Sequence, residues 1–137
     1  NELCETTTRG MFVTFVAGWL DPISQHLRII NAGHLPCLIV GNNDVKQIGA
    51  KGPPLGVTPN LQYPTDELPF DSERLYLYSD GFIECKDSSG EELGVKGFLR
   101  WVIGSRQMNI NEQLTWIRQQ FERQAEAQLD DLTLLIV

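Results

Sequence analysis

The sequence has 137 residues, enough for one domain with a hydrophobic core, and we expect a fragment of something longer because a strand-like apolar run comes almost at once. Its formal charge of −7, with 11 scattered Lys and Arg residues, argues against nucleic-acid binding, which normally needs a basic face. No apolar run approaches the roughly 18 residues of a membrane span, and no signal peptide is recognisable. Three cysteines without CxxC spacing indicate a reduced, cytoplasmic compartment, and Cys37 lies in an apolar run typical of a core.

The first strongly apolar segment, residues 11–20, is rich in aromatic and β-branched side chains and predicts a strand covered on both faces. Asp21-Pro22 breaks this strand, so residues 26–30 predict the return strand of a hairpin. Residues 37–40 and 45–48 predict the two arms of a second hairpin.

Glycines and prolines shape the middle of the chain. They make residues 49–57 a loop, and two prolines restrict residues 61–70 to an edge strand. Alternation of Leu and Tyr over residues 74–78 predicts the clearest strand of the chain.

Two helices are predicted after residue 94. The first follows from apolar residues at positions 95, 98, 99 and 102, which share one helix face. Asn109 and Glu112 have the spacing of a capping box, and the helix that they begin is expected to run to about Gln128. Residues 130–137 predict a terminal strand. Strands followed by helices and one more strand indicate an α+β fold with helices on a sheet face.

Carboxylates mark two strand ends. Asp80 ends the strand at 74–78 and is followed by Gly81, while Asp130 and Asp131 open the last strand. If these strands are antiparallel neighbours, Asp80 and Asp130 converge at one rim, where a hard cation such as Mg²⁺ or Mn²⁺ would relieve their repulsion. Spacing alone leaves the alternative open that both are ordinary turn and helix-end residues.

No side chain is framed as an activated nucleophile. The sequence has no GxSxG motif, and its two histidines lack an evident catalytic partner. His34, in the NAGH motif, is expected to be a hydrogen-bonded structural residue, although its place at a strand end would also let it reach a site.

The order of motifs resembles that of the metal-dependent type 2C protein phosphatases, in particular the bacterial SpoIIE/RsbU branch. The motifs are MFVTFVAGWLDP, LRIINAGHLPCLIV, GPPLGV, ERLYLYSDGFIEC and DDLTLLIV, between Met11 and Val137. Each motif is short, and their common order carries the resemblance. It identifies residues 1–137 as the C-terminal portion of such a domain, an antiparallel β-sandwich flanked by helices with its N-terminal part missing.

The resemblance implies a site with two Mn²⁺ or Mg²⁺ ions held by aspartates. Asp80 and Asp130 match metal-binding, catalytic aspartates of the family, Asp131 is a weaker metal candidate, and the backbone of Gly81 would pass close to the metals. The implied reaction is attack of a metal-bound hydroxide on phosphoserine or phosphothreonine. The sequence departs from the family in lacking its early D-x-x-G-H-G motif, so the resemblance implies an incomplete metal site in this fragment.

Partners also follow from the resemblance. They are a phosphoprotein substrate of the anti-anti-sigma type, an upstream sensor or receiver domain of a response regulator, and a second copy in a homodimer. One alternative is a phosphatase-like adaptor that binds a sigma-factor pathway protein without catalysis. A further alternative is a plain α+β interaction module with solvated aspartates.

Overall fold

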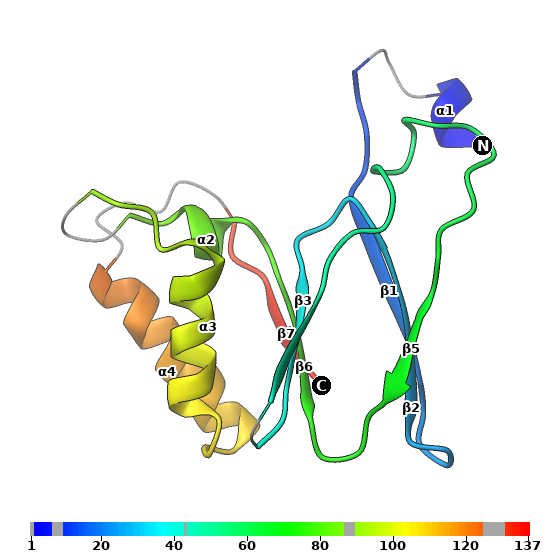
Figure 1. Ribbon diagram of the computed structural model, residues 1–137. Helices are drawn as coiled ribbons and strands as arrows, with labels where there is room; N and C mark the ends of the chain where they lie inside the picture. Colours follow the sequence, from blue (N-terminus) through cyan, green and yellow to red (C-terminus); the bar gives the residue numbers. More distant parts are fainter. Residues whose placement is uncertain (1, 7–9, 43, 87–89, 125–130) are drawn as a thin grey trace. The chain divides into compact units, whose positions relative to one another are not determined.

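A computed structural model describes residues 2–6, 10–42, 44–86, 90–124 and 131–137. The chain is α+β with antiparallel sheets and helices, as predicted (Figure 1). It divides into two compact units, which we describe separately: Asn1–Cys37 with Gln47–Glu73, and Leu38–Lys46 with Arg74–Val137.

The first unit contains a three-stranded antiparallel sheet in the order β1-β2-β5. The predicted hairpin is confirmed, because β1 (Phe15–Asp21) pairs with β2 (His26–Ala32) along its whole length. The Asp21 side chain closes the turn by accepting a hydrogen bond from the Ile23 N–H at 2.9 Å. Strand β5 (Asp66–Pro69) pairs with β2 at the other edge, as its prolines predicted, and a short helix, α1 (Glu2–Thr6), precedes the sheet.

The prediction that β1 is covered on both faces is wrong. The side chains of Phe15 and Trp19 are 46% and 73% exposed, and only Val16 and Asp21 of this strand are half-buried. Strand β1 is an edge strand. Aromatic and β-branched residues suit a pleated backbone wherever it lies, so the composition indicated a strand but not what covers it.

The NAGH and GPPLG motifs form one locked substructure in this unit. Asn31 is buried, accepts a hydrogen bond from the His34 N–H at 2.9 Å and donates to the carbonyl of Leu35 at 3.0 Å. Gly33 has a φ of +70° and lies against the ring of Pro54. The His34 side chain is hydrogen-bonded, as expected, with its Nδ1 at 3.3 Å from Thr14 Oγ1. Residues 49–57 form a loop, as predicted.

The second unit contains most of a four-stranded sheet in the order β4-β3-β6-β7. Its strands are β3 (Cys37–Val40), β4 (Val45–Ile48), β6 (Arg74–Tyr78) and β7 (Leu134–Ile136), and the predicted second hairpin is confirmed. Cys37 is 1% exposed, so it is a core residue as predicted, and burial raises the pKa of its thiol to about 11.

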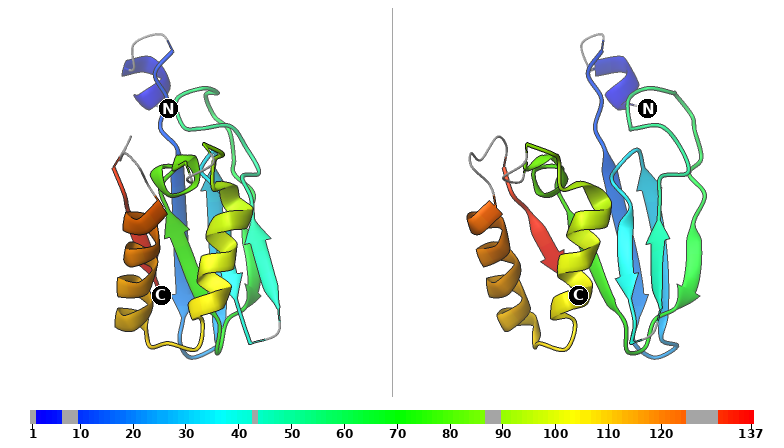
Figure 2. Two further views of the ribbon diagram at one scale, coloured as in Figure 1. Left: turned by 90° about the vertical axis from the view of Figure 1, so that its left-hand side faces the viewer. Right: turned by 60° about the vertical axis from the view of Figure 1, so that its left-hand side comes forward.

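Two helices of this unit, α3 (Gly94–Ser105) and α4 (Ile110–Gln124), lie side by side along the sheet (Figure 2). The capping box is confirmed, since Asn109 Oδ1 accepts from the Glu112 N–H at 3.0 Å and Glu112 Oε2 accepts from the Asn109 N–H at 3.3 Å. The expected continuation to about Gln128 lies outside the described residues. None of the helices that the structure describes is both long and apolar enough to cross a membrane.

Candidate metal site at the ends of β6 and β7

The predicted adjacency of the two acidic strand ends rests on a strand pairing that the structure confirms. Strands β6 and β7 are antiparallel neighbours, with Tyr78 opposite Leu134. One residue further, the Ser79 N–H donates to the Thr133 carbonyl at 3.0 Å. The chain after β6 and the chain before β7 therefore leave the sheet side by side.

The Ser79 side chain strengthens this junction. Its Oγ donates to the backbone carbonyl of Asp131 at 2.9 Å and accepts from the Thr133 N–H at 2.9 Å. A single hydroxyl thus fixes the backbone at Asp131 relative to the residue that precedes Asp80. The sequence reasoning missed Ser79. The available signal was a small hydroxyl residue directly before a strand-end carboxylate, where a side chain can replace the last ladder hydrogen bonds.

Asp80 is exposed and is the N-cap of a short helix, α2 (Gly81–Glu84), which the sequence reasoning did not predict. Its Oδ1 accepts a hydrogen bond from the Gly81 N–H at 3.1 Å. Among the described residues, the Gly81 N–H is the one hydrogen-bond donor given for this carboxylate. Gly81 is buried and its φ is not in the left-handed region, so the local backbone does not demand a glycine.

Aromatic packing holds α2, and with it Asp80, in place. The ring of Phe82 lies 5.2 Å from that of Phe98 in α3 and 5.8 Å from that of Phe121 in α4, measured between ring centroids. The helix ends at Cys85, whose Sγ donates to the Phe82 carbonyl. The position of Asp80 is therefore fixed by packing among three helices of the same unit, α2, α3 and α4.

The second half of the predicted site is described only in part. Asp131 is exposed at the start of the segment leading into β7. Asp130 lies outside the described residues, so its role as a metal ligand and catalytic residue stays a prediction, as do those of Asp80, Asp131 and Gly81. Among the residues that are described, no three His, Cys, Asp or Glu side chains come together as metal ligands would.

The donor chemistry still fits a hard cation. Asp80 and Asp131 offer carboxylate oxygens, which Mg²⁺ and Mn²⁺ prefer. Two carboxylates supply only part of the roughly six oxygens of such an ion, and the rest would come from water and from other residues.

The whole chain, residues 1–137, matches the family described as Stage II sporulation protein E (SpoIIE). Protein IcfG of Synechocystis sp. is 29% identical over an alignment of 132 residues, which covers 93% of this chain and 21% of that protein. The SiaA-PP2C domain of Pseudomonas aeruginosa has a similar fold, with a TM-score of 0.76 at 23% identity, over 90% of this chain and 50% of that one. The phosphatase domain of SpoIIE from Bacillus subtilis, in an Mn-presoaked structure, has a TM-score of 0.65 at 15% identity, over 98% and 60% of the two chains.

The chain therefore has the fold of PP2C phosphatase domains and covers only a portion of such a domain. The chain belongs to the SpoIIE family. It spans between about a fifth and three fifths of the length of these relatives.

Proposed function

We propose that this chain supplies the β6–β7 end of the active site of a metal-dependent protein phosphatase that hydrolyses phosphoserine or phosphothreonine. The observation that supports it most directly is the junction of β6 and β7, where Ser79 ties the backbone of Asp131 beside that of Asp80. Membership of the SpoIIE family agrees with this reaction.

In this proposal Asp80 holds a metal through Oδ2, while its Oδ1 accepts the hydrogen bond from the Gly81 N–H. Asp130 and Asp131 bring further carboxylate oxygens from the other strand. When bound, Mn²⁺ or Mg²⁺ lowers the pKa of water and neutralises phosphoryl charge, which supplies the chemistry that no nucleophilic side chain provides here. The helix α2 keeps the Asp80 backbone fixed as the substrate binds.

The test is hydrolysis of p-nitrophenyl phosphate by a polypeptide that contains the whole phosphatase domain, with and without Mn²⁺. We expect turnover only with the metal, and a loss of at least about 100-fold in Asp80→Asn and in Asp130→Asn. A matched control is Asp44→Asn, because Asp44 is exposed beside the start of β6, at the end of the same sheet opposite to Asp80. Unchanged rates in Asp80→Asn would refute the proposed role of this residue.

A phosphatase-like adaptor that binds a regulatory protein without catalysis is the second candidate. Calorimetric titration of the same polypeptide with Mn²⁺ separates the two functions. Heat that disappears in Asp80→Asn supports the phosphatase, whereas absence of Mn²⁺ binding together with capture of a regulatory protein supports the adaptor. We also propose that the substrate is a phosphorylated regulatory protein. In this proposal a sensor or receiver domain controls the activity of the phosphatase.

A further inference from the structure

Asp80 lies midway between two aromatic residues that share one packing partner. Tyr78, two residues before Asp80, and Phe82, two residues after it, both pack on the ring of Phe98 in α3. The ring centroids of Tyr78 and Phe82 lie 4.5 Å and 5.2 Å from that of Phe98. All three side chains are buried. One residue of α3 therefore holds the chain on both sides of Asp80, and we call Tyr78, Phe82 and Phe98 the ring cluster.

The ring cluster has a specific geometry. Both pairs are tilted, with interplanar angles of 40° and 42°, at separations at which aromatic rings attract one another. A hollow of about 430 Å³, lined also by residues of α4 and β7, lies beside Phe82. This space would let the Phe82 ring shift if Phe98 became smaller. The position of Phe82 therefore depends on Phe98.

The hydrogen bonds at Asp80 move with the residue and do not tie it to the sheet. The N–H groups of Ile83 and Glu84 donate to the Asp80 carbonyl at 2.8 Å and 3.0 Å, and the Gly81 N–H donates to Asp80 Oδ1 at 3.1 Å. All three bonds lie within the four residues of α2 and its N-cap. A helix of this length has little stability of its own, so packing decides where α2 and Asp80 lie.

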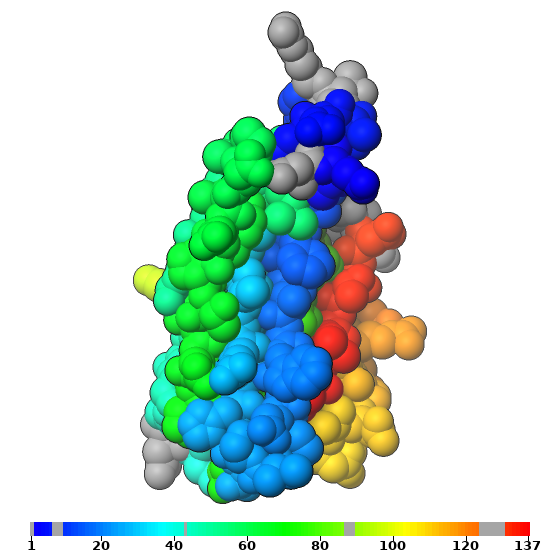
Figure 3. Space-filling view, turned by 90° about the vertical axis from the view of Figure 1, so that its right-hand side faces the viewer, coloured from blue at the N-terminus to red at the C-terminus, as the bar shows by residue number. Residues whose placement is uncertain are grey.

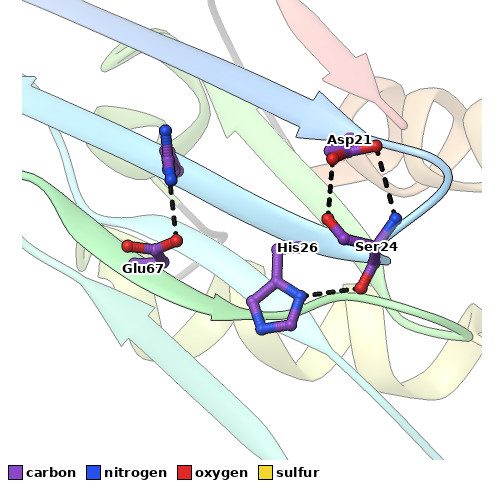
Figure 4. Close-up of polar contacts among 5 residues, drawn as sticks. Asp21, Ser24, His26 and Glu67 are labelled. Atoms are coloured by element: carbon purple, nitrogen blue, oxygen red, sulfur yellow. Dashed lines mark hydrogen bonds and ion pairs between the residues drawn. The ribbon is translucent and has the colours of Figure 1, made fainter.

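Asp21, which also ends a strand, is held in a different way. Its Oδ1 accepts from the Ser24 N–H at 3.3 Å, and its Oδ2 accepts from the Ser24 hydroxyl at 2.8 Å (Figure 4). The turn that these bonds close follows β1, whose atoms are drawn in blue on the face shown in Figure 3. Both carboxylate oxygens of Asp21 are thereby engaged. Positioning through buried rings uses no carboxylate oxygen, so the arrangement at Asp80 is compatible with metal binding.

We propose that Phe98 is a positioning residue for the metal site. By holding Tyr78 and Phe82 it sets the place of the Asp80 carboxylate, and through this carboxylate it sets the affinity for Mn²⁺. The inference rests on the proposed function, because it takes Asp80 as a metal ligand. Loss of a residue that orients a ligand typically lowers metal affinity by 10-fold to 100-fold. The ligands themselves are unchanged, so saturating Mn²⁺ restores turnover.

The test compares Phe98→Leu with the wild type in a polypeptide that contains the whole phosphatase domain. Hydrolysis of p-nitrophenyl phosphate is measured over a range of Mn²⁺ concentrations. We expect the apparent Kd for Mn²⁺ to rise about 10-fold in Phe98→Leu, with kcat at saturating Mn²⁺ within about 2-fold of the wild type. An unchanged Kd would overturn the inference.

Ile39→Val is the matched control. Ile39 is 1% exposed and lies in β3 opposite Leu75, at the end of β6 away from Asp80. This substitution also loosens the core of the second unit, but it should leave the Mn²⁺ affinity unchanged. An equal loss of affinity in Ile39→Val and Phe98→Leu would overturn the inference, because general loosening of the core would then explain both.

Hydrogen exchange without metal, followed by NMR, tests the structural half of the inference in the same polypeptides. The amides of Ile83 and Glu84 should exchange at least about 10-fold faster in Phe98→Leu than in Ile39→Val, because α2 has lost its seat. Equal exchange in the two variants would overturn the inference. A wild-type domain that binds no Mn²⁺ would refute the proposed function and the inference with it. Equally tight Mn²⁺ binding by the wild type and Phe98→Leu would refute the inference alone.

Discussion

The hydroxyl of Ser79 donates a hydrogen bond to the backbone carbonyl of Asp131 at 2.9 Å. The same oxygen accepts from the Thr133 N–H, so one side chain joins the end of β6 to the approach to β7. The two acidic segments of the candidate site are 50 residues apart in sequence, from Asp80 to Asp130, and their proximity depends on this junction.

Ser79→Ala removes both hydrogen bonds of that hydroxyl. Because they lie at the exposed end of the sheet, we expect the free energy of unfolding to fall by only about 1 kcal/mol. In the complete domain the apparent affinity for Mn²⁺ should fall about 10-fold, since the backbone that carries Asp130 and Asp131 is no longer fixed. Urea unfolding and Mn²⁺-dependent turnover measure the two effects.

Thr115→Ala is the matched control for Ser79→Ala. The Thr115 hydroxyl is also exposed, but it donates to the Asn111 carbonyl within α4 and joins no two elements. Its loss should leave the Mn²⁺ dependence as in the wild type. Equal Mn²⁺ affinities in the two variants would show that Ser79 has no positioning role.

Gln113 is the centre of a buried polar network in the second unit. It is 0% exposed, and its Oε1 accepts from Arg74 Nη1 at 2.9 Å and from the Tyr76 hydroxyl at 3.0 Å. Its Nε2 donates to the Val102 carbonyl at 3.2 Å and to Ser105 Oγ at 3.0 Å. One side chain therefore links β6, α3 and α4.

Gln113→Ala should lower the free energy of unfolding by about 2 to 4 kcal/mol, because it creates a cavity and leaves buried donors without their acceptor. Gln119→Ala, on the exposed side of the same helix, should change it by less than about 0.5 kcal/mol. Urea unfolding of both variants tests this. A loss of similar size in both would mean that the buried network adds no stability beyond that of an exposed glutamine.

The Cys37 thiol makes the stability depend on pH. Burial raises its pKa from the ordinary 9.0 to about 11, so the unfolded chain loses this proton at lower pH than the folded chain does. The stabilisation that comes from keeping the Cys37 thiol protonated is complete below pH 9. As the pH rises toward 11, the free energy of unfolding falls by roughly 1.4 kcal/mol for each pH unit. Burial also raises the pKa of Tyr76, which acts in the same direction at alkaline pH.

Urea unfolding between pH 7 and 11 measures this loss. Cys37→Ala is less stable throughout because of the missing sulfur, but its stability should fall less steeply with pH than that of the wild type. Parallel curves for the two proteins would contradict the assignment to Cys37.

Local signals in the sequence predicted the elements well. The capping box at Asn109 and Glu112 acts within one helix turn, and the prolines that confined residues 61–70 to an edge act within one strand. The pairing of β6 with β7, by contrast, was only a condition of the predicted site, because the sequence does not show which strands are neighbours; the structure shows this pairing.

Features that depend on distant parts of the chain were not predictable in this way. Periodicity indicates that β1 is a strand, but its exposure depends on which other segments reach it. The short helix α2 arises because Asp80 caps it and Phe82 packs on two later helices, which no pattern within four residues reveals. The neighbouring strand ends beside Asp80 and Asp131 therefore agree with the expectation, whereas the packing that supports Asp80 was not predicted.

Gly33 is required where the NAGH motif meets the GPPLG loop. Its φ of +70° disfavours any side chain, and a Cβ built there would lie 2.5 Å from Cγ of Pro54. Gly33→Ala should therefore lower the free energy of unfolding by about 2 to 4 kcal/mol. Gly49→Ala is the control, since a Cβ at position 49 meets nothing within 4 Å and φ there is not in the left-handed region. It should leave stability unchanged or raise it by up to about 1 kcal/mol. Thermal unfolding compares the two variants, and a Gly33→Ala protein as stable as Gly49→Ala would show that the two motifs are not locked together.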